Sequence, residues 1–411
     1  MADQKKLLIL TQYFPPEVGA PQNRLFELAV RLQKMGVDVT VLTAMPNYPQ
    51  MKIYKEYEGK KYHYEEIQGI PVHRSSIYIP KNKSIIQRLL NYFSFVYSSA
   101  GVGKKMIGEV DFILCESPPL FLGWSALYLK RKKKAKLIFN VSDLWPESAE
   151  KLGVVTNKYM LGLAYRLEAK LYKRSVLVTG QTQGICKNIN ERFPQVKTFW
   201  LPNGVDPDFY DPSVGNKDSW RSKNNFNADD ILFLYAGIIG LAQGLEVILK
   251  AAQLTKENKR IKYILLGSGP EKEKLLKLKA DLHIENVFFF GAVSKKEMPE
   301  IVMASDASVI PLKKMDLFLG AIPSKIFENL AMEKPIVLGV DGEAKNLFID
   351  QGKCGLYFEP ENENELAKAC VQLATNHQLR LELGKKGREY VKENFNRDKI
   401  AAKLKTELDN L

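Results

Sequence analysis

Short apolar runs, each followed by a glycine-containing loop and an amphipathic helix, recur along the whole chain. The first run, Lys6 to Thr11, leads through a loop with Gly19 into a helix expected from about Arg24 to Met35. A second run, Val37 to Thr43, follows that helix, so the order is strand, loop, helix, strand. Such units build parallel sheets with helices on both faces, which predicts an α/β fold with doubly wound, Rossmann-like sheets.

The length of the chain predicts two domains, because 411 residues exceed what one hydrophobic core usually organises. The turn-rich segment P-N-G-V-D-P-D-F-Y at 202–210 marks the boundary, so the domains are expected to cover 1–203 and 204–395. Residues 362–411 are expected to be helical. Further strands are expected at Val72–Tyr78, Asp111–Glu116, Leu137–Val141, Val176–Gly180, Lys197–Leu201, Ile231–Ala236, Ile261–Leu266, Asn286–Phe290, Ala307–Pro311, Ile336–Val340 and Gly355–Phe358.

Residues 323–343 combine the start of a helix with a buried strand. Ser324 is the expected N-cap, and Lys325 and Glu328 occupy neighbouring positions in the first turn. Open α/β sheets bind ligands at the C-terminal ends of their strands, and Ile336–Val340 is such a strand. A lysine there suits a phosphate, and a carboxylate one turn later suits sugar or ribose hydroxyls. On these residues alone, a solvated Lys–Glu pair beside a core strand is the simpler alternative.

Glycines follow several of the expected strands. After the strand that ends at Ala236, three glycines could bring backbone N–H groups against a diphosphate, namely Gly237, Gly240 and Gly244. G-S-G-P at 267–270 and G-A-V at 291–293 follow the next two strands. Gly19 precedes a helix N-terminus that would attract anions, although an ordinary strand-to-helix connection explains it nearly as well. The first loop lacks G-x-G-x-x-G, so the dinucleotide fingerprint is absent there.

The positive charge of the chain lies in its first half. Residues 1–205 carry 30 Lys and Arg against 16 Asp and Glu, whereas residues 206–411 carry 30 against 31. This asymmetry indicates that one domain meets something anionic. The four cysteines lack metal or redox spacing, which favours free thiols in a reducing compartment. No apolar stretch reaches the roughly 18 residues of a membrane span, and the N-terminus reads as a first strand rather than a signal peptide.

Two segments of the first half bear on a membrane surface. Residues 84–107 are apolar and aromatic, which fits either a helix in the lipid interface or a helix packed in the core. The run K-R-K-K-K-A-K at 130–136 could bind anionic lipid, or it could be the solvated end of a helix. A nucleic-acid patch is a third possibility, but no recognition motif accompanies the run.

Carboxylates leave the strand Leu137–Val141 at its C-terminal end. Asp143 and Glu147 lie in S-D-L-W-P-E-S-A-E at 142–150, where either could touch a sugar. The alternative is that Asp143 caps the following helix. No D-x-D follows a strand, and the four histidines lie outside every motif, so neither a metal nor a histidine base is expected.

Taken in order, the motifs resemble the retaining glycosyltransferases of family 4, which have the GT-B fold: two Rossmann-like domains that face a central cleft. The resemblance covers nearly the whole chain. M-P-N-Y-P at 45–49 and D-L-W-P-E-S at 143–148 are further similar to bacterial surface-polysaccharide members, including those that transfer N-acetylfucosamine in O-antigen and capsule synthesis. The motifs that carry the resemblance are G-A-P at 19–21, P-N-G-V-D at 202–206, G-x-x-G-x-x-Q-G at 237–244, G-S-G-P at 267–270, G-A-V at 291–293 and P-S-K-I-F-E-N-L-A at 323–331.

The resemblance implies roles for individual residues. Glu328 would hold the ribose, while Lys325, Gly240 and Gly19 would surround the diphosphate and 291–293 would meet the base. Catalytic roles fall to Asp143, Lys325 and Glu328, and the acceptor side to Asn47, Trp145 and Glu147. The final helix, 396–411, would cross back to the N-terminal domain. The donor-binding set implied in this way is Gly19, Arg24, Gly240, Gln243, Gly269, Ala292, Val293, Ser324, Lys325 and Glu328.

Two departures from the family pattern concern the donor. The family often carries two glutamates separated by seven residues, but Gly320 stands where the first belongs, so the carboxylate that steers the donor sugar is missing. Ile238 and Gln243 replace the usual Arg and Lys of the diphosphate loop. Lys325 and Arg24 would then carry more of the phosphate charge.

The function expected on this basis is metal-independent, retaining transfer of a sugar, a UDP-linked N-acetyl-deoxyhexose by the subfamily likeness, to a polyprenyl-diphosphate-linked saccharide. The protein would be cytoplasmic and peripheral at the inner face of the plasma membrane, with no cofactor and no nucleic-acid partner. A nucleotide-sugar epimerase of the same fold is an alternative, although its acidic and histidine groups are not evident. A basic adaptor of membranes or nucleic acids is another, and it predicts no nucleotide affinity.

Overall fold

The computed structural model describes residues 4–17, 19–48, 50–80, 85–151, 153 and 155–411. Pro49 of the motif at 45–49 and Ser84 of the segment at 84–107 therefore lie outside the described residues. The chain divides into two compact units. Unit 1 comprises residues 1–203 with 397–411, and unit 2 comprises residues 204–396. The return to unit 1 thus begins at Arg397.

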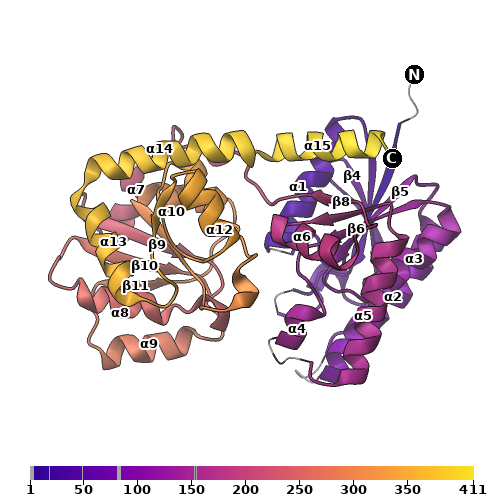
Figure 1. Cartoon of the computed structure of the whole chain (residues 1–411), viewed down its shortest axis with the longest axis horizontal. Coiled ribbons are helices and arrows are strands. Elements are labelled where there is room, and N and C mark those ends of the chain that lie inside the picture. Colours follow the sequence, from indigo (N-terminus) through magenta and orange to yellow (C-terminus); the bar gives the residue numbers. More distant parts are fainter. Residues whose placement is uncertain (1–3, 18, 49, 81–84, 152, 154) are drawn as a thin grey trace. The chain divides into compact units, whose positions relative to one another are not determined.

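Unit 1 is built on a sheet of eight strands in the order β3-β4-β2-β1-β5-β6-β7-β8. Figure 1 shows this sheet surrounded by helices. All pairs are parallel except β3 with β4. The apolar runs of the sequence become these strands because a parallel strand is buried on both faces. The strands are β1 (Lys6–Leu10), β2 (Asp38–Ala44), β3 (Tyr62–Ile67), β4 (Ile70–Ser75), β5 (Phe112–Ser117), β6 (Lys136–Val141), β7 (Leu177–Gly180) and β8 (Thr198–Trp200).

Helices cover both faces of this sheet. Alternate strand residues such as Leu8 and Ile113 pack on one face against helices α2, α3, α5 and α6. Their neighbours, such as Leu7 and Phe112, pack on the other face against α1 and α15. The C-terminal helix of the chain is therefore part of the core of unit 1. The helices are α1 (Ala20–Lys34), α2 (Ile85–Met106), α3 (Leu122–Lys133), α4 (Glu147–Lys151), α5 (Lys158–Arg174), α6 (Gln183–Arg192) and α15 (Arg397–Asp409), with a 3-10 turn η1 (Lys55–Tyr57).

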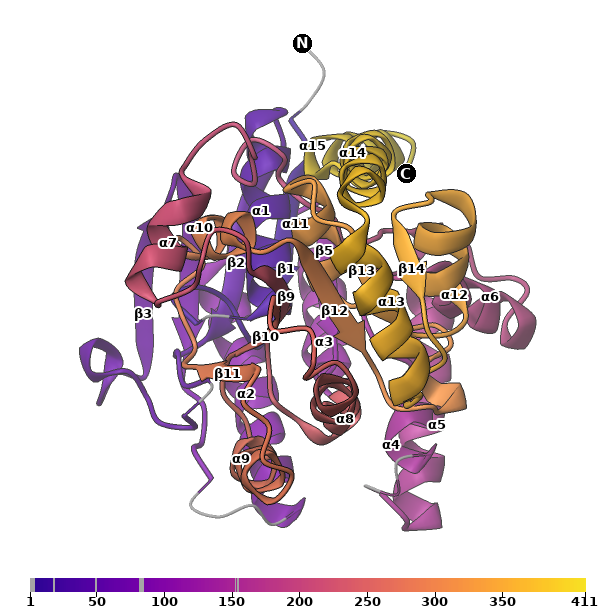
Figure 2. The ribbon, with the colours of Figure 1, turned by 90° about the vertical axis from the view of Figure 1, so that its left-hand side faces the viewer.

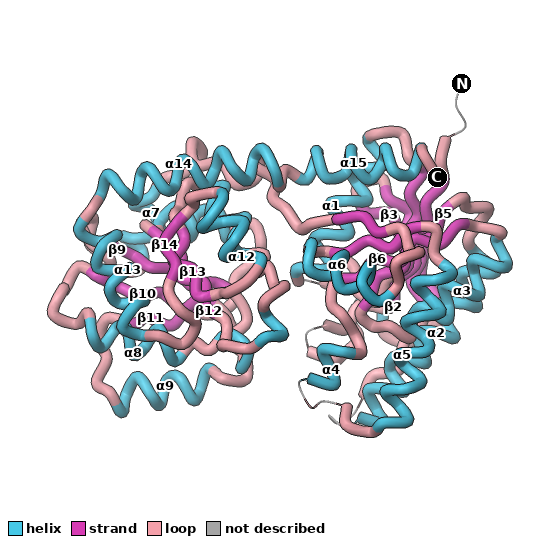
Figure 3. Tube along the Cα trace, in the orientation of Figure 1, coloured by secondary structure: helices cyan, strands magenta, loops and turns pink. Residues whose placement is uncertain are grey.

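Unit 2 has a fully parallel sheet of six strands in the order β11-β10-β9-β12-β13-β14. Figure 2 labels its strands, and Figure 3 shows them between helices. Alternate residues such as Phe233 and Tyr263 face α8, α9 and α13. The strands are β9 (Ile231–Ala236), β10 (Ile261–Leu266), β11 (Val287–Phe290), β12 (Ala307–Pro311), β13 (Ile336–Gly339) and β14 (Gly355–Tyr357).

The helices of unit 2 connect these strands in the right order for a doubly wound sheet. They are α7 (Lys217–Lys223), α8 (Glu246–Leu254), α9 (Lys272–Asp281), α10 (Met298–Ala304), α11 (Lys325–Ala331), α12 (Glu343–Lys345), α13 (Glu363–Thr375) and α14 (His377–Asn394). Single turns η2 (Leu241–Gln243) and η3 (Asp316–Phe318) lie in loops, and a π-helical turn η4 (Asn346–Gln351) follows α12.

In each sheet, the order in which successive strands are added reverses at one point. In unit 2 the chain moves from β9 outward to β11 and then returns to the other side of β9 with β12. In unit 1 the corresponding reversal separates β1 from β5. Open α/β sheets bind ligands outside the carboxyl ends of the strands at such a switch point. The loops after β9 and β12, and those after β1 and β5, are therefore the places where a site is expected in each unit.

Several local predictions needed correction. Strand β3 was not expected, because its residues are polar and tyrosine-rich; it is a half-exposed edge strand, antiparallel to β4. Strand β4 spans Ile70–Ser75 rather than Val72–Tyr78. Helix α1 begins at Ala20 rather than Arg24, with a proline in its first turn, where the missing N–H costs nothing. Helix α5, of 17 residues, had no counterpart in the predicted elements.

Within the described part of the chain, no helix is both long enough and apolar enough to cross a membrane.

Candidate functional site

The loops after β9 and β10 in unit 2 lie against each other, backbone to backbone. The amide of Ile239 donates to the carbonyl of Ser268 at 2.9 Å, and the amide of Gly237 donates to Leu266 O at the same distance. A Cβ atom on Gly269 would lie 2.2 Å from Ile239 O, and one on Gly267 would lie 1.9 Å from Gly237 O. Both glycines also have positive φ angles, 159° and 147°. Only glycine fits these positions, and the packed loops form a rigid rim at the switch point.

Lys325, the first residue of α11, reaches this rim from the neighbouring strand connection. Its Nζ lies 3.8 Å from the ring centroid of Tyr235, the penultimate residue of β9. A Cβ on Gly237 would come within 3.0 Å of the same nitrogen, so the ammonium passes directly over that glycine. Burial lowers the pKa of Lys325 to about 7, and the nearby carboxylate of Glu328 opposes this only in part. The lysine is thus a cation that the protein leaves short of compensating charge.

The remaining predicted donor residues of unit 2 surround the same loops. Gly240 is half-buried and extended, and Gln243 lies in η2, with its Oε1 placed 2.9 Å from where a Gly240 Cβ would be. Ala292 is exposed and Val293 half-buried in the loop after β11. Ser324 occupies the N-cap position of α11, but its side chain makes no capping hydrogen bond. The loop after β12 contains Gly320. A hydrogen bond of 2.7 Å from the amide of Glu343 to the carbonyl of Leu319 holds this loop against the start of α12.

In unit 1, Arg24 does not present an uncompensated charge. Its guanidinium lies 2.7 Å from the Glu116 carboxylate and 2.6 Å from Ser142 Oγ, and it donates to Gln181 at 3.1 Å. Only 8% of Arg24 is exposed. Asn140 completes the network by donating to the other oxygen of Glu116. The sequence did not identify Glu116 as a partner, and its position at the carboxyl end of β5, across the switch point from β1, was the available signal.

Asn47 belongs to a loop cluster that Glu17 organises. The buried Glu17 carboxylate accepts hydrogen bonds from the amides of Asn47 and Tyr48, each at 2.8 Å, and from Phe14 N at 3.1 Å. Burial raises the pKa of Glu17 against the effect of these bonds. Asn47 is fully buried and donates to Met45 O, which is a position inside the loop rather than on its surface. The backbone of Gly19 is extended, with φ 178°.

Asp143, Trp145 and Glu147 follow β6 in unit 1. Asp143 accepts a hydrogen bond from Ser148 Oγ in α4 at 2.9 Å. Desolvation by surrounding protein raises the pKa of Asp143, although the residue still reaches solvent. Trp145 packs edge-on against Phe121 at 5.3 Å, and Glu147 forms an ion pair with Lys151 at 2.7 Å.

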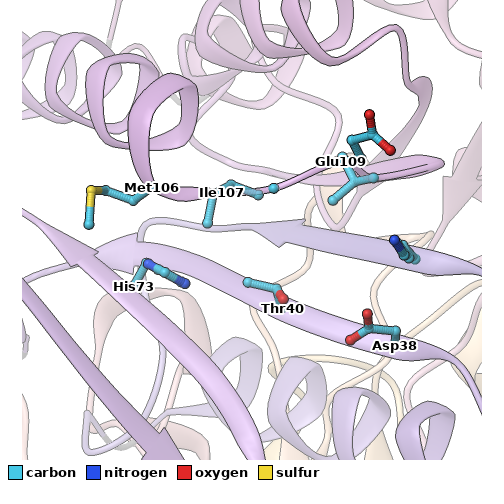
Figure 4. Close-up of a pocket in the computed structure, with 9 residues that line it drawn as sticks. Asp38, Thr40, His73, Met106, Ile107 and Glu109 are labelled. Carbon is cyan, nitrogen blue, oxygen red and sulfur yellow. The ribbon is translucent and has the colours of Figure 1, made fainter.

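A pocket of about 220 Å³ lies elsewhere in unit 1. Lys6 and Asp38, the first residues of β1 and β2, line it with Glu109, and Figure 4 shows His73 and Met106 on its opposite side. It therefore opens at the amino ends of β1 and β2, away from the loops that carry the predicted residues. Among the residues that the structure describes, no group of three or more His, Cys, Asp or Glu could hold a metal ion.

Two family models divide the chain between them. Residues 22–209 match the model described as "Glycosyltransferase Family 4", and residues 216–390 match "Glycosyl transferases group 1". The putative colanic acid biosynthesis glycosyl transferase WcaI of Escherichia coli K12 is 26% identical over 335 residues, covering 80% of this chain and 81% of the relative.

Solved structures with the same fold cover almost the whole chain. Sucrose-phosphate synthase from Thermosynechococcus elongatus superposes with a TM-score of 0.78 at 17% identity, covering 99% of both chains. HepE from Anabaena, solved in complex with UDP and glucose, superposes with a TM-score of 0.74 at 16% identity, covering 99% of this chain and all of that one.

The packed glycine loops predict unequal tolerance of alanine. Gly269→Ala should destabilise unit 2 by about 2–3 kcal/mol, because it combines a strained φ with a backbone clash. Gly291→Ala is the matched control, since its Cβ would meet nothing within 4 Å. Urea unfolding followed by the fluorescence of Trp220, the tryptophan of unit 2, measures both. Equal stability of the two variants would contradict the close packing.

Proposed function

Since the chain is a glycosyltransferase of family 4 with the GT-B fold, we propose that it moves a sugar from a UDP-linked donor to a polyprenyl-diphosphate-linked saccharide in bacterial surface-polysaccharide synthesis. Its named relatives place it among glycosyltransferases of polysaccharide or glycolipid synthesis. The donor, the acceptor and a location at the inner face of the plasma membrane are parts of the proposal.

The observation that carries the donor assignment is the position of Lys325 at the rim of glycine loops in unit 2. A diphosphate supplies the negative charge that the half-buried ammonium lacks, and the loops after β9 and β10 offer backbone at close range. Glu328, one turn along α11, is assigned to the ribose hydroxyls. HepE, solved with UDP, has the same fold, which supports a uridine nucleotide.

The transferred sugar is proposed to be an N-acetyl-deoxyhexose. Ile238 and Leu241 in the loop after β9 are 59% and 60% exposed, and Leu319 after β12 is 46% exposed. The carboxylate usual at position 320 is absent, so the loops present apolar surface where hydroxyl-binding groups are common in the family. Methyl and acetyl substituents suit such a surface better than a fully hydroxylated hexose does.

In the proposed mechanism, negative charge develops on the leaving diphosphate, and Lys325 with backbone N–H groups stabilises it without a metal. The leaving phosphate then takes the acceptor proton on the same face of the sugar. Asp143 is assigned to the transferred sugar or acceptor, and Trp145 and Glu147 to the acceptor side; Asn47 is fully buried and is left out of this assignment.

Transfer is predicted to retain the anomeric configuration of the donor, because leaving group and acceptor use one face of the sugar. The anomeric proton coupling in the NMR spectrum of the fresh product measures this. A product with inverted configuration would overturn the front-face mechanism while leaving donor binding intact.

Nucleotide binding should depend on pH through Lys325. The free protein has a pKa of about 7 at this lysine, and the diphosphate should raise it, so binding above pH 7 requires uptake of a proton. The affinity for UDP should be flat below pH 7 and fall by up to about tenfold per pH unit above it, until the pKa of the complex is passed. Isothermal titration between pH 7 and 9 measures the slope.

Lys325→Arg is the control, because arginine stays charged and should remove the slope. A slope that survives in this variant would assign the proton to another group. GDP and ADP serve as competing ligands; absence of any nucleotide affinity would favour the adaptor alternative. Release of epimerised or free sugar without an acceptor would favour the epimerase.

A basic aromatic surface of unit 1 supports the membrane part of the proposal. We call it the α2–α3 face; it comprises Leu90, Tyr97, Trp124, Tyr128, Arg131, Lys132 and Lys134. Its apolar members are 38–77% exposed, and its helical spacing places Arg131 and Lys132 below Tyr128. Trp124 stacks on Phe93 at 5.5 Å, which joins the two helices. Aromatic and cationic side chains on one surface suit the interface of an anionic bilayer.

The structure also bears on the alternatives for the segment at 84–107 and for the basic run at 130–136. Helix α2 buries Phe95 completely while exposing 77% of Tyr97, so it is core-packed on one side and open on the other. In the run at 130–136, Lys130 donates to the carbonyl of Arg174 and Lys133 to that of Ile107. These two lysines bind carbonyls at helix and loop ends, whereas Arg131, Lys132 and Lys134, the cations of the α2–α3 face, are exposed.

Neutralising Arg131, Lys132 and Lys134 together to Gln should weaken binding to phosphatidylglycerol vesicles about a hundredfold, since each charge contributes about 1 kcal/mol. Vesicle sedimentation at two salt concentrations measures this. The control variant changes three exposed lysines of unit 2, Lys250, Lys256 and Lys259, to Gln. UDP affinity should be unchanged in both; equal loss of vesicle and UDP binding would count against separate surfaces.

A further inference from the structure

We propose that Tyr235 is a positioning residue of the donor site, whose ring holds the Lys325 ammonium and whose hydroxyl holds the glycine loop. The inference rests on the proposed function, because it assigns Lys325 to the diphosphate. Tyr235 does not face the donor itself; it acts through the two groups that do.

The geometry joins three chain segments at one aromatic ring. Tyr235 is 1% exposed near the carboxyl end of β9. Its hydroxyl donates to Ile238 O at 2.5 Å, inside the loop that Gly237 opens. Its ring lies 3.8 Å below the Nζ of Lys325, which comes from α11 about 90 residues later. One side chain therefore ties the loop after β9 to the lysine on the far side of the switch point.

The contact is shorter than most ammonium–aromatic pairs in the molecule. Ten of the cation–ring pairs in the described residues have separations of 5.2–6.0 Å, whereas those of Lys325 and Lys345 are 3.8 and 3.9 Å. An aromatic face attracts the charged form of an amine but gives no full counter-charge, so the ammonium stays available to an anion. A carboxylate in the same place would neutralise the lysine, as Glu116 neutralises Arg24 in unit 1.

Besides this ring, Lys325 faces a charged group, the carboxylate of Glu328 from the same helix. This carboxylate also favours the protonated amine. Removing the ring while keeping an apolar side chain should therefore favour the neutral amine. It should also release the ammonium from its position above Gly237. Removing only the hydroxyl should loosen the loop without changing the charge state.

The experiment compares Tyr235→Leu with Tyr235→Phe by NMR after reductive ¹³C-methylation of the lysines. The Lys325 resonance is assigned by its loss in Lys325→Arg. In Tyr235→Leu the titration midpoint of Lys325 should fall by about 0.5–1.5 pH units relative to the native chain, and in Tyr235→Phe it should stay in place. UDP affinity at pH 6.5, measured by titration calorimetry, should fall at least about fivefold more in Tyr235→Leu than in Tyr235→Phe.

Tyr357→Leu is the matched control, since it removes the other short pair of unit 2, Lys345 over Tyr357 at 3.9 Å. It should leave both readouts unchanged. Identical midpoints in Tyr235→Leu and Tyr235→Phe, or a raised midpoint in Tyr235→Leu, would overturn the inference even if UDP binds the native chain. Failure of the native chain to bind UDP would instead overturn the proposed function, and the NMR midpoints would still test the ring contact.

Discussion

Unit 2 depends on a backbone contact that leaves no room for a side chain. Gly267 and Gly269 bring the loop after β10 against the carbonyls of Gly237 and Ile239 at distances that exclude a Cβ. Two amide hydrogen bonds then lock the loops together. Because this rim is rigid, Tyr235 near the end of β9 and Lys325 at the start of α11 can stay in contact without a covalent or ionic link.

The two units share a strand order around the switch point, but the cation there has a carboxylate partner in unit 1 and an aromatic ring in unit 2. Unit 1 buries Arg24 with Glu116, Ser142 and Gln181, so its cation is fully compensated. Removing either member of such a pair leaves an unpaired charge, which makes the network a structural element first. Unit 2 instead sets Lys325 on an aromatic ring beside glycines. Arg24 was expected to supplement Lys325 at the phosphate. Glu116, which only the fold brings near, competes for its charge.

Local pattern predicts most strands and the glycine-containing loop after β9, and its misses have identifiable causes. The strands Ile231–Ala236 and Ala307–Pro311 are found as expected, because a parallel strand buried on both faces must be continuously apolar. Strand β3 was missed because an edge strand need bury neither face. The sequence predicts too late a start for helix α1, because Pro21 is typical of a loop although proline also fits the first helical turn. Glu17 carries no local signal and Glu116 only its place at the end of a predicted strand, since their partners Asn47 and Arg24 lie 30 and 92 residues away.

By itself the sequence determined where most strands and loops lie, which loops contain glycine, and that the positive charge lies in the first half. These properties are local: apolar period, absence of a Cβ and formal charge can be read without neighbours. Only the tertiary structure decided that the ammonium of Lys325 lies on Tyr235 while the guanidinium of Arg24 lies on Glu116. Whether a buried cation is compensated depends on distances through space and on the water removed around it, and neither quantity is encoded in the spacing of residues along the chain.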